Sequence, residues 1–129
     1  MQVDTPDAST RAFNKAIFRI DMSDQYTDVS VAELQSMLQH KDFTFVNVHI
    51  PFQGKINPTD AFIPYNEIDQ HLSQLPADKN AKIVLYCRSG SMSTEAAHTL
   101  ADLGYTDVFN LSGGFNAWKA AGLPLDMNQ

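Results

Sequence analysis

Residues 82–93 join a predicted strand to a predicted helix, and they read Lys82-Ile83-Val84-Leu85-Tyr86-Cys87-Arg88-Ser89-Gly90-Ser91-Met92-Ser93. The apolar run before Cys87 is typical of a buried strand. Small polar residues follow at once, and apolar residues at helical spacing come after them. Cys87, the only cysteine among the 129 residues, is therefore predicted to lie on a strand-to-helix turn.

Further strands and helices are predicted to alternate on both sides of this turn. The sequence Ser30-Val31-Ala32-Glu33 has the pattern of a capping box and begins a helix whose Leu34 and Leu38 share one face with Val31. Strand 43–48 is continuously apolar and β-branched, which is typical of burial on both faces of a parallel sheet. The other predicted elements are strands at 61–63, 82–86 and 107–111 and helices at 66–75 and 115–121.

The helix after the turn completes the pattern. Its apolar residues share one face, and Gly104 is predicted to cap its C-terminus. Strands that alternate with helices predict an α/β fold with a mainly parallel sheet. The apolar face comprises Ala96, Ala97, Leu100 and Leu103.

Composition limits the chain to one modest core. Of its residues, 43% are hydrophobic, and a formal net charge of −6 argues against nucleic acid or an anionic membrane as the main partner. We predict an arm or extra helix at 1–25, a single domain at 26–129, no transmembrane helix and no signal peptide. A cytoplasmic location and an exported mature form both stay open.

The chemistry of the predicted turn depends on the thiolate of Cys87. Backbone N–H groups and the positive end of the following helix would favour the thiolate, which is the reactive form of cysteine. Arg88 would add to this field. A small buried cysteine at a strand end is the alternative, but it leaves the Ser/Gly run unexplained. A lone cysteine excludes an internal disulfide and a multi-cysteine zinc site, and His40, His71 and His98 lack metal-ligand spacing.

Four segments in order resemble the rhodanese-like sulfurtransferase family. Residues 87–93 resemble its active-site loop, and 111–118 with 122–124 resemble its closing signature, in which a double glycine opens the last helix. Residues 45–49 fall where the family has a strand ending in Asp-Val-Arg, and 61–65 resemble its next strand. The resemblance covers roughly Tyr26 to Leu125.

The resemblance implies a single rhodanese-like domain with a mainly parallel central sheet and helices on both faces. It implies an enzyme in which Cys87 carries sulfane sulfur as a persulfide and the loop Arg88, Ser89, Gly90, Ser91, Met92 and Ser93 stabilises it. Gly90 would let the backbone turn, and Ser91 or Ser93 is expected to cap the helix. The donor would be thiosulfate, a polysulfide or a persulfide, and the acceptor a thiol, cyanide or a relay protein. No metal or organic cofactor is implied.

Three positions depart from the family pattern. Met92 stands where many members that accept thiosulfate carry arginine, so we expect thiosulfate to be a poor donor. Asn47 and His49 replace the expected Asp and Arg at the end of a strand. His49 is either a pH-dependent substrate contact or, as we favour, a surface histidine. Phe115 and Trp118 are expected to pack in the core.

Two other functions deserve comparison. Cysteine-based phosphatases and arsenate reductases clamp an oxyanion with an arginine at the position that Ser93 occupies here, so this activity is not expected. A rhodanese-like module that binds a partner without catalysis is the stronger alternative, given the three departures. Cys87 and its Ser/Gly loop favour catalysis over that module.

Overall fold

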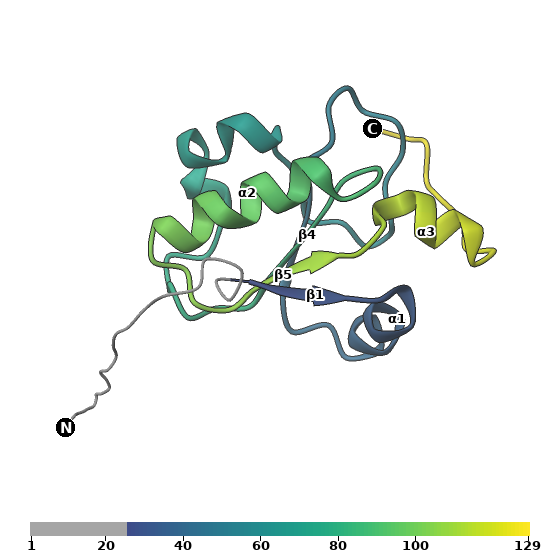
Figure 1. Cartoon of the computed structure of the whole chain (residues 1–129), viewed down its shortest axis with the longest axis horizontal. Coiled ribbons are helices and arrows are strands. Elements are labelled where there is room, and N and C mark those ends of the chain that lie inside the picture. Colours follow the sequence, from purple (N-terminus) through teal and green to yellow (C-terminus); the bar gives the residue numbers. More distant parts are fainter. Residues whose placement is uncertain (1–25) are drawn as a thin grey trace.

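A five-stranded parallel sheet is the centre of the computed structural model, which describes residues 26–129. The strand order is β1-β5-β4-β2-β3, so β4 is central (Figure 1). Every neighbouring pair of these strands is parallel. The strands are β1 (Thr27–Val29), β2 (Thr44–Asn47), β3 (Ala61–Phe62), β4 (Ile83–Tyr86) and β5 (Val108–Leu111).

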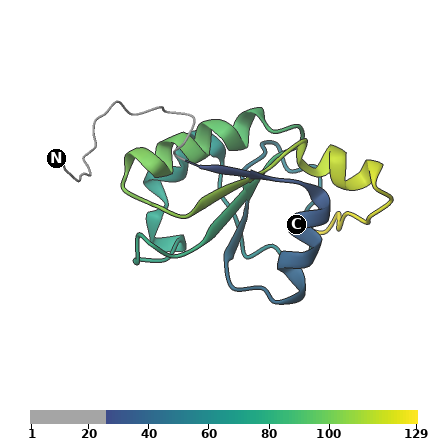
Figure 2. The same cartoon turned by 60° about the horizontal axis from the view of Figure 1, so that its bottom comes forward.

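Helices cover both faces of the sheet, as the sequence predicted. In Figure 1, α2 (Ser91–Asp102) lies above the strands and α1 (Val31–Gln39) lies below them. The first face buries Ile83 and Leu85 of β4 in a cluster with the apolar residues of α2. The other face buries Val84 and Tyr86 with residues of α1 and α3 (Gly114–Ala120). All four residues of β4 are fully buried, because apolar residues cover them from both sides. Figure 2 shows helices on both sides of the sheet.

Local signals fix the helix boundaries. The Ser30 hydroxyl accepts a hydrogen bond from the Glu33 N–H at 3.1 Å, and the Glu33 carboxylate accepts one from the Ser30 N–H at 2.8 Å. The capping box is thus confirmed. Gly104, with a φ of +98°, follows the C-terminal end of α2. Leu103 lies beyond the last turn and is 39% exposed, so its assignment to the apolar face was wrong.

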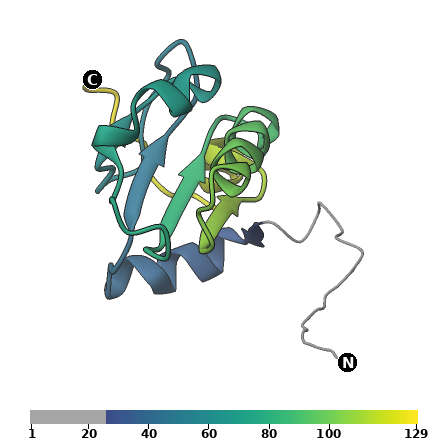
Figure 3. The same ribbon diagram turned by 90° about the vertical axis from the view of Figure 1, so that its left-hand side faces the viewer.

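Two further elements differ from the sequence prediction. The helix expected at 66–75 is instead a pair of 3₁₀ segments, Tyr65–Gln70 and Leu72–Gln74, because His71 adopts φ −128° and ψ 33° and interrupts the helical path. Strand β1 was not predicted, since it has three residues and two of them are exposed. It is the edge strand beside β5, and in Figure 3 α1 follows it beneath the sheet.

The predicted arm at 1–25 lies outside the described residues. Within 26–129, none of the helices combines the length and apolar character that a membrane crossing requires.

We predict that replacing Ser30 with Ala lowers the free energy of unfolding by about 1 kcal/mol, because the first turn of α1 loses its side-chain acceptor. Urea unfolding would measure the change. Ser36 is exposed in the middle of the same helix, so Ser36→Ala is the matched control and should leave stability unchanged or slightly raised. Equal losses in both variants would contradict the assignment of Ser30 as the cap.

Candidate active site

Cys87 directly follows the central strand and precedes α2. Its side chain is 1% exposed and belongs to the apolar cluster beneath α2. The chain reaches the helix through residues 88–90, and Gly90 is the N-cap with a φ of +117°. That conformation strongly favours glycine, so Gly90 is the residue that allows the turn. The sulfur therefore lies at the N-terminus of a twelve-residue helix.

Hydrogen-bond donors converge on the sulfur. The Gly90 N–H lies 3.0 Å from Sγ, and the Ser93 hydroxyl oxygen lies 3.4 Å from it. Burial raises the pKa of the Cys87 thiol, but hydrogen bonds from the Ser93 hydroxyl and from the N–H groups of Ser93, Gly90 and Ser89 outweigh it and lower the pKa below the usual value. The arrangement favours a thiolate inside a largely apolar surrounding.

The two serines of the first helical turn have different surroundings. Ser91 is exposed at the first helical position, and Ser93 is fully buried. Neither side chain caps α2, so that expectation was wrong. Gly90 occupies the N-cap, and the Ser93 hydroxyl turns inward to the Gly90 carbonyl, the Cys87 sulfur and Asn110.

Asn110 and Asp28 join this network, and the sequence analysis missed both. Asn110 Oδ1 lies 2.5 Å from the Ser93 hydroxyl oxygen, and Asn110 Nδ2 donates to Asp28 Oδ1 at 2.9 Å. Asn110 is a buried polar residue in a strand that reads Val-Phe-Asn-Leu. This interruption of an apolar strand was the available signal, because buried amides require partners.

The double glycine, Gly113 and Gly114, allows the start of α3 to hydrogen-bond to the loop at Cys87. The N–H groups of Phe115 and Asn116 donate to the carbonyl oxygens of Cys87 and Arg88, at 2.9 and 3.0 Å. Gly114 has a φ of +58°, and a Cβ at this position would overlap both carbonyl oxygens. Only glycine lets the two backbones approach this closely.

Asn47 and His49 make hydrogen bonds to the backbone of the loop that follows β2. Asn47 is buried, accepts from the His49 N–H at 3.0 Å and donates to the Gly54 carbonyl at 3.0 Å. His49 is 4% exposed, so the favoured interpretation as a surface histidine was wrong. Its Nδ1 lies 2.8 Å from the Pro51 carbonyl oxygen, and its ring meets the Phe115 ring edge-on at 5.5 Å. His49 thus contacts the residue that holds the Cys87 carbonyl.

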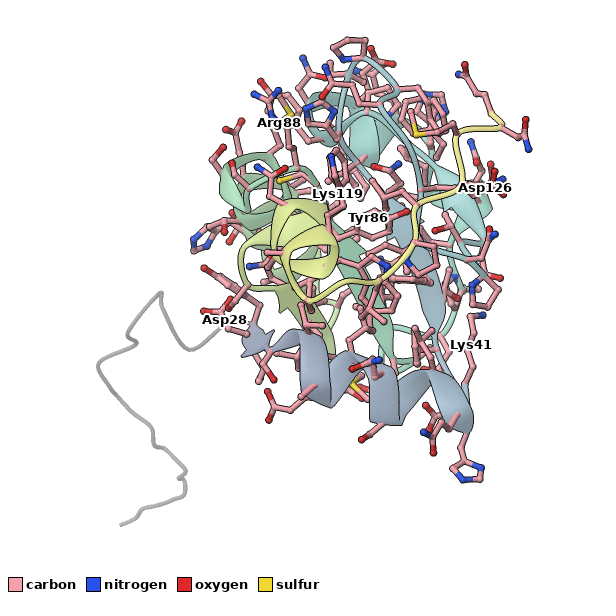
Figure 4. All side chains as sticks on the ribbon, turned by 90° about the vertical axis from the view of Figure 1, so that its right-hand side faces the viewer. Asp28, Lys41, Tyr86, Arg88, Lys119 and Asp126 are labelled. Carbon is pink, nitrogen blue, oxygen red and sulfur yellow. The ribbon has the colours of Figure 1, made fainter. Side chains whose placement is uncertain are left out.

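Arg88 and Met92 have different surroundings. Arg88, labelled in Figure 4, is exposed, and its Nη1 lies 3.3 Å from Oε1 of Gln53. Met92 is half-buried and packs against the cluster that contains Cys87. Phe115 and Trp118 are buried on the opposite face, as predicted. No group of three acidic, histidine or cysteine side chains in the described part of the chain could hold a metal ion.

Comparison with known proteins identifies this arrangement. Residues 30–121 match the family model of the rhodanese-like domain. The chain belongs to the rhodanese-like domain family. The resemblance found in the sequence and the rhodanese-like α/β fold are both confirmed.

Individual rhodanese-like relatives agree with this assignment. A protein named sulfurtransferase from Allochromatium vinosum is 36% identical over 94 residues, which cover 70% of this chain and 85% of that protein. Thiosulfate sulfurtransferase GlpE of Actinobacillus pleuropneumoniae is 25% identical over 107 residues, or 81% of this chain and 97% of the relative. A rhodanese-related protein from Thermoplasma volcanium has a crystal structure that matches at a TM-score of 0.68 and 25% identity, covering 80% of this chain and 100% of its own. At the level of the family, these matches support a rhodanese-type sulfurtransferase.

We predict that Ser93→Ala raises the pH at which Cys87 alkylation reaches half its maximal rate, because the thiolate loses one donor. The wild-type midpoint should lie below that of free cysteine measured under the same conditions. Iodoacetamide labelling followed by intact mass across a pH series measures both. Ser91→Ala is the control and should keep the wild-type midpoint; a midpoint unmoved by Ser93→Ala contradicts the assignment.

We also predict that Gly114→Ala unfolds at a lower urea concentration than Gly122→Ala. Both glycines have positive φ, so each substitution costs about 1–2 kcal/mol in backbone strain. Only Gly114 has backbone atoms where the methyl group would lie, whereas the space around Gly122 is open. Gly114→Ala should also slow Cys87 alkylation, since the loop must move. Equal effects of the two substitutions would contradict the close contact.

Proposed function

We propose that the protein transfers sulfane sulfur through a persulfide on Cys87 to a thiophilic acceptor. The observation that carries the proposal is the convergence of the Gly90 N–H and the Ser93 hydroxyl on a buried sulfur at a helix N-terminus. Donors that stabilise the thiolate make it available as a nucleophile, and the backbone N–H groups of the loop can also stabilise the persulfide anion.

Loading the enzyme is a displacement at sulfur. The Cys87 thiolate attacks the outer sulfur of the donor, an S–S bond forms, and the bond between that sulfur and the rest of the donor breaks. With thiosulfate, sulfite leaves with the electron pair; with a persulfide R–S–SH, RS⁻ leaves with the electron pair and takes up the proton of the transferred sulfur, so that RSH is released. The transferred sulfur then carries the negative charge as Cys87–S–S⁻.

Unloading is the same displacement in the opposite sense. An acceptor such as cyanide attacks the outer sulfur, thiocyanate forms, and the electron pair of the S–S bond returns to Cys87 as thiolate. A thiol acceptor takes the sulfur as a new persulfide, either on a small molecule or on a protein of a sulfur relay. The N–H groups of Ser89, Gly90 and Ser93 stabilise the thiolate before loading and after release, and in the proposal the loop also offers N–H groups to the outer sulfur of the persulfide.

Met92 makes thiosulfate a poor donor in this proposal. A half-buried thioether stands where an arginine would attract a dianion, and exposed Arg88 is the cation that remains on this loop. A persulfide anion carries one negative charge, and a polysulfide spreads its charge along a sulfur chain, so both depend less on such a cation. We therefore assign these donors to the protein ahead of thiosulfate.

Intact mass spectrometry tests the proposal. The wild type and Cys87→Ser are incubated with polysulfide or thiosulfate, and cyanide is then added. We expect a gain of one sulfur on the wild type alone, larger with polysulfide and removed by cyanide. No gain from either donor would overturn the proposal and favour the non-catalytic binding module.

We predict that Met92→Arg increases kcat/KM for thiosulfate by roughly tenfold, the value of one charge-assisted hydrogen bond of about 1.5 kcal/mol. Steady-state assays with cyanide as acceptor measure the change. Met92→Leu keeps the size and removes the sulfur, so this control should leave thiosulfate turnover unchanged. An arginine variant that folds, alkylates normally and gains no activity contradicts the role assigned to Met92.

A further inference from the structure

Four elements contribute to one chain of polar side chains that ends at the sulfur. Asp28 on β1 accepts from Asn110 on β5 at 2.9 Å, and Asn110 Oδ1 lies 2.5 Å from the Ser93 hydroxyl on α2. That hydroxyl lies 3.4 Å from Cys87 Sγ, after β4. Asp28 and Asn110 are register partners in the parallel sheet, which places both side chains on the face that α2 covers.

The carboxylate of Asp28 orients the amide of Asn110. An ionised carboxylate only accepts hydrogen bonds, so the amide nitrogen must face it. The amide oxygen of Asn110 then faces Ser93, and it too only accepts. The hydroxyl of Ser93 must therefore donate along this 2.5 Å contact, since two acceptors without a hydrogen between them repel each other.

Ser93 has one hydroxyl hydrogen and three acceptors within reach. They are Asn110 Oδ1 at 2.5 Å, the Gly90 carbonyl oxygen at 3.1 Å and Cys87 Sγ at 3.4 Å. A hydroxyl has one hydrogen to donate, so when it makes a full hydrogen bond to one acceptor, the other two acceptors receive none. Asn110 holds the shortest contact, and the sulfur holds the longest.

We propose that Asn110, oriented by Asp28, is a positioning residue that competes with Cys87 for the single hydroxyl hydrogen of Ser93. When Cys87 is a thiolate, the hydroxyl gives up its bond to Asn110 in order to donate to sulfur. This exchange reduces the net stabilisation that Ser93 gives the thiolate. A less stabilised thiolate is the stronger nucleophile, because nucleophilicity rises with basicity.

The effect of this competition on sulfur transfer rests on the proposed function. In the persulfide the negative charge lies on the outer sulfur, and Cys87 Sγ becomes neutral. The Ser93 hydroxyl then returns to Asn110 without loss. The competition thus raises the free energy of the empty thiolate relative to the loaded enzyme, and it favours loading.

The charged or titratable side chains considered besides Cys87 are Arg88 and His49 on the adjoining loops and Asp28 on β1. Arg88 is exposed on the active-site loop, and His49 is buried beside Phe115 after β2. Asp28, labelled in Figure 4, is exposed on β1. In residues 26–129, none of these three side chains is hydrogen-bonded to Sγ, so the direct side-chain donor is Ser93.

The test is the pH midpoint of Cys87 alkylation in a double-mutant cycle of Asn110→Leu and Ser93→Ala. Leu has nearly the shape of Asn and removes the competing acceptor. We expect Asn110→Leu alone to lower the midpoint by about one pH unit, the order of one hydrogen bond to a charged group. In the Ser93→Ala background the same substitution should cause no shift, because no hydroxyl remains to redirect. A raised or unchanged midpoint, or equal shifts in both backgrounds, overturns the proposal.

Asp28→Ala gives a second test at an exposed position. Without the carboxylate, the Asn110 amide is free to turn its nitrogen toward Ser93, and the midpoint should fall. Removing a negative charge also lowers the midpoint by a Coulombic effect, and this part persists in the Ser93→Ala background. The proposal requires a larger fall when Ser93 is present, and equal falls overturn it.

These measurements do not require sulfur transfer. A Ser93-dependent shift together with no persulfide would refute the proposed function and leave the competition standing. Persulfide formation without such a shift would refute the competition alone.

Discussion

The close contact between Gly114 and the backbone at Cys87 is the constraint on which the site depends. Two N–H groups at the start of α3 take the carbonyl oxygens of Cys87 and Arg88. With these acceptors satisfied, the loop can present N–H groups to the sulfur instead of carbonyls. Besides the Ser93 hydroxyl, the groups that lower the pKa of the Cys87 thiol are backbone N–H groups, which explains why few side chains are required. A β5-α3 turn without a side chain is thus a condition for the chemistry at the end of β4.

Most of the fold could be predicted because its signals are local. Apolar runs predicted β2 and β4, a mostly apolar stretch predicted β5, and the capping box located the start of α1. Strand β1 has no such signal, since its pairing with β5 joins residues about eighty positions apart and buries only Val29. The prediction of an α-helix at 66–75 was wrong for a different reason. Helical spacing of apolar residues does not distinguish an α-helix from shorter 3₁₀ turns.

The residues of the candidate site also fall into two groups, those that a local sequence pattern predicts and those that only the fold brings together. Cys87 and the loop 88–93 were found because a strand, a small polar run and a helix are contiguous in the sequence. Asp28 and Asn110 meet Ser93 only after β1 and β5 align, so no local pattern connects them. His49 was expected at the surface because it follows a strand and precedes a turn-rich loop. Its burial depends on α3, which the chain supplies more than sixty residues later.

The edge position of β1 links local opening of the sheet to the chemistry of its centre. This strand has three residues, pairs with β5 alone and carries Asp28, whereas β4 is wholly buried. Edge strands detach at a smaller free-energy cost than central ones. When β1 detaches, the Asn110 amide loses its fixed orientation while the core around Cys87 stays folded. Warming below the unfolding transition should thus change thiol reactivity before the core unfolds, so the edge of the sheet acts as a thermal control on a buried cysteine beside its central strand.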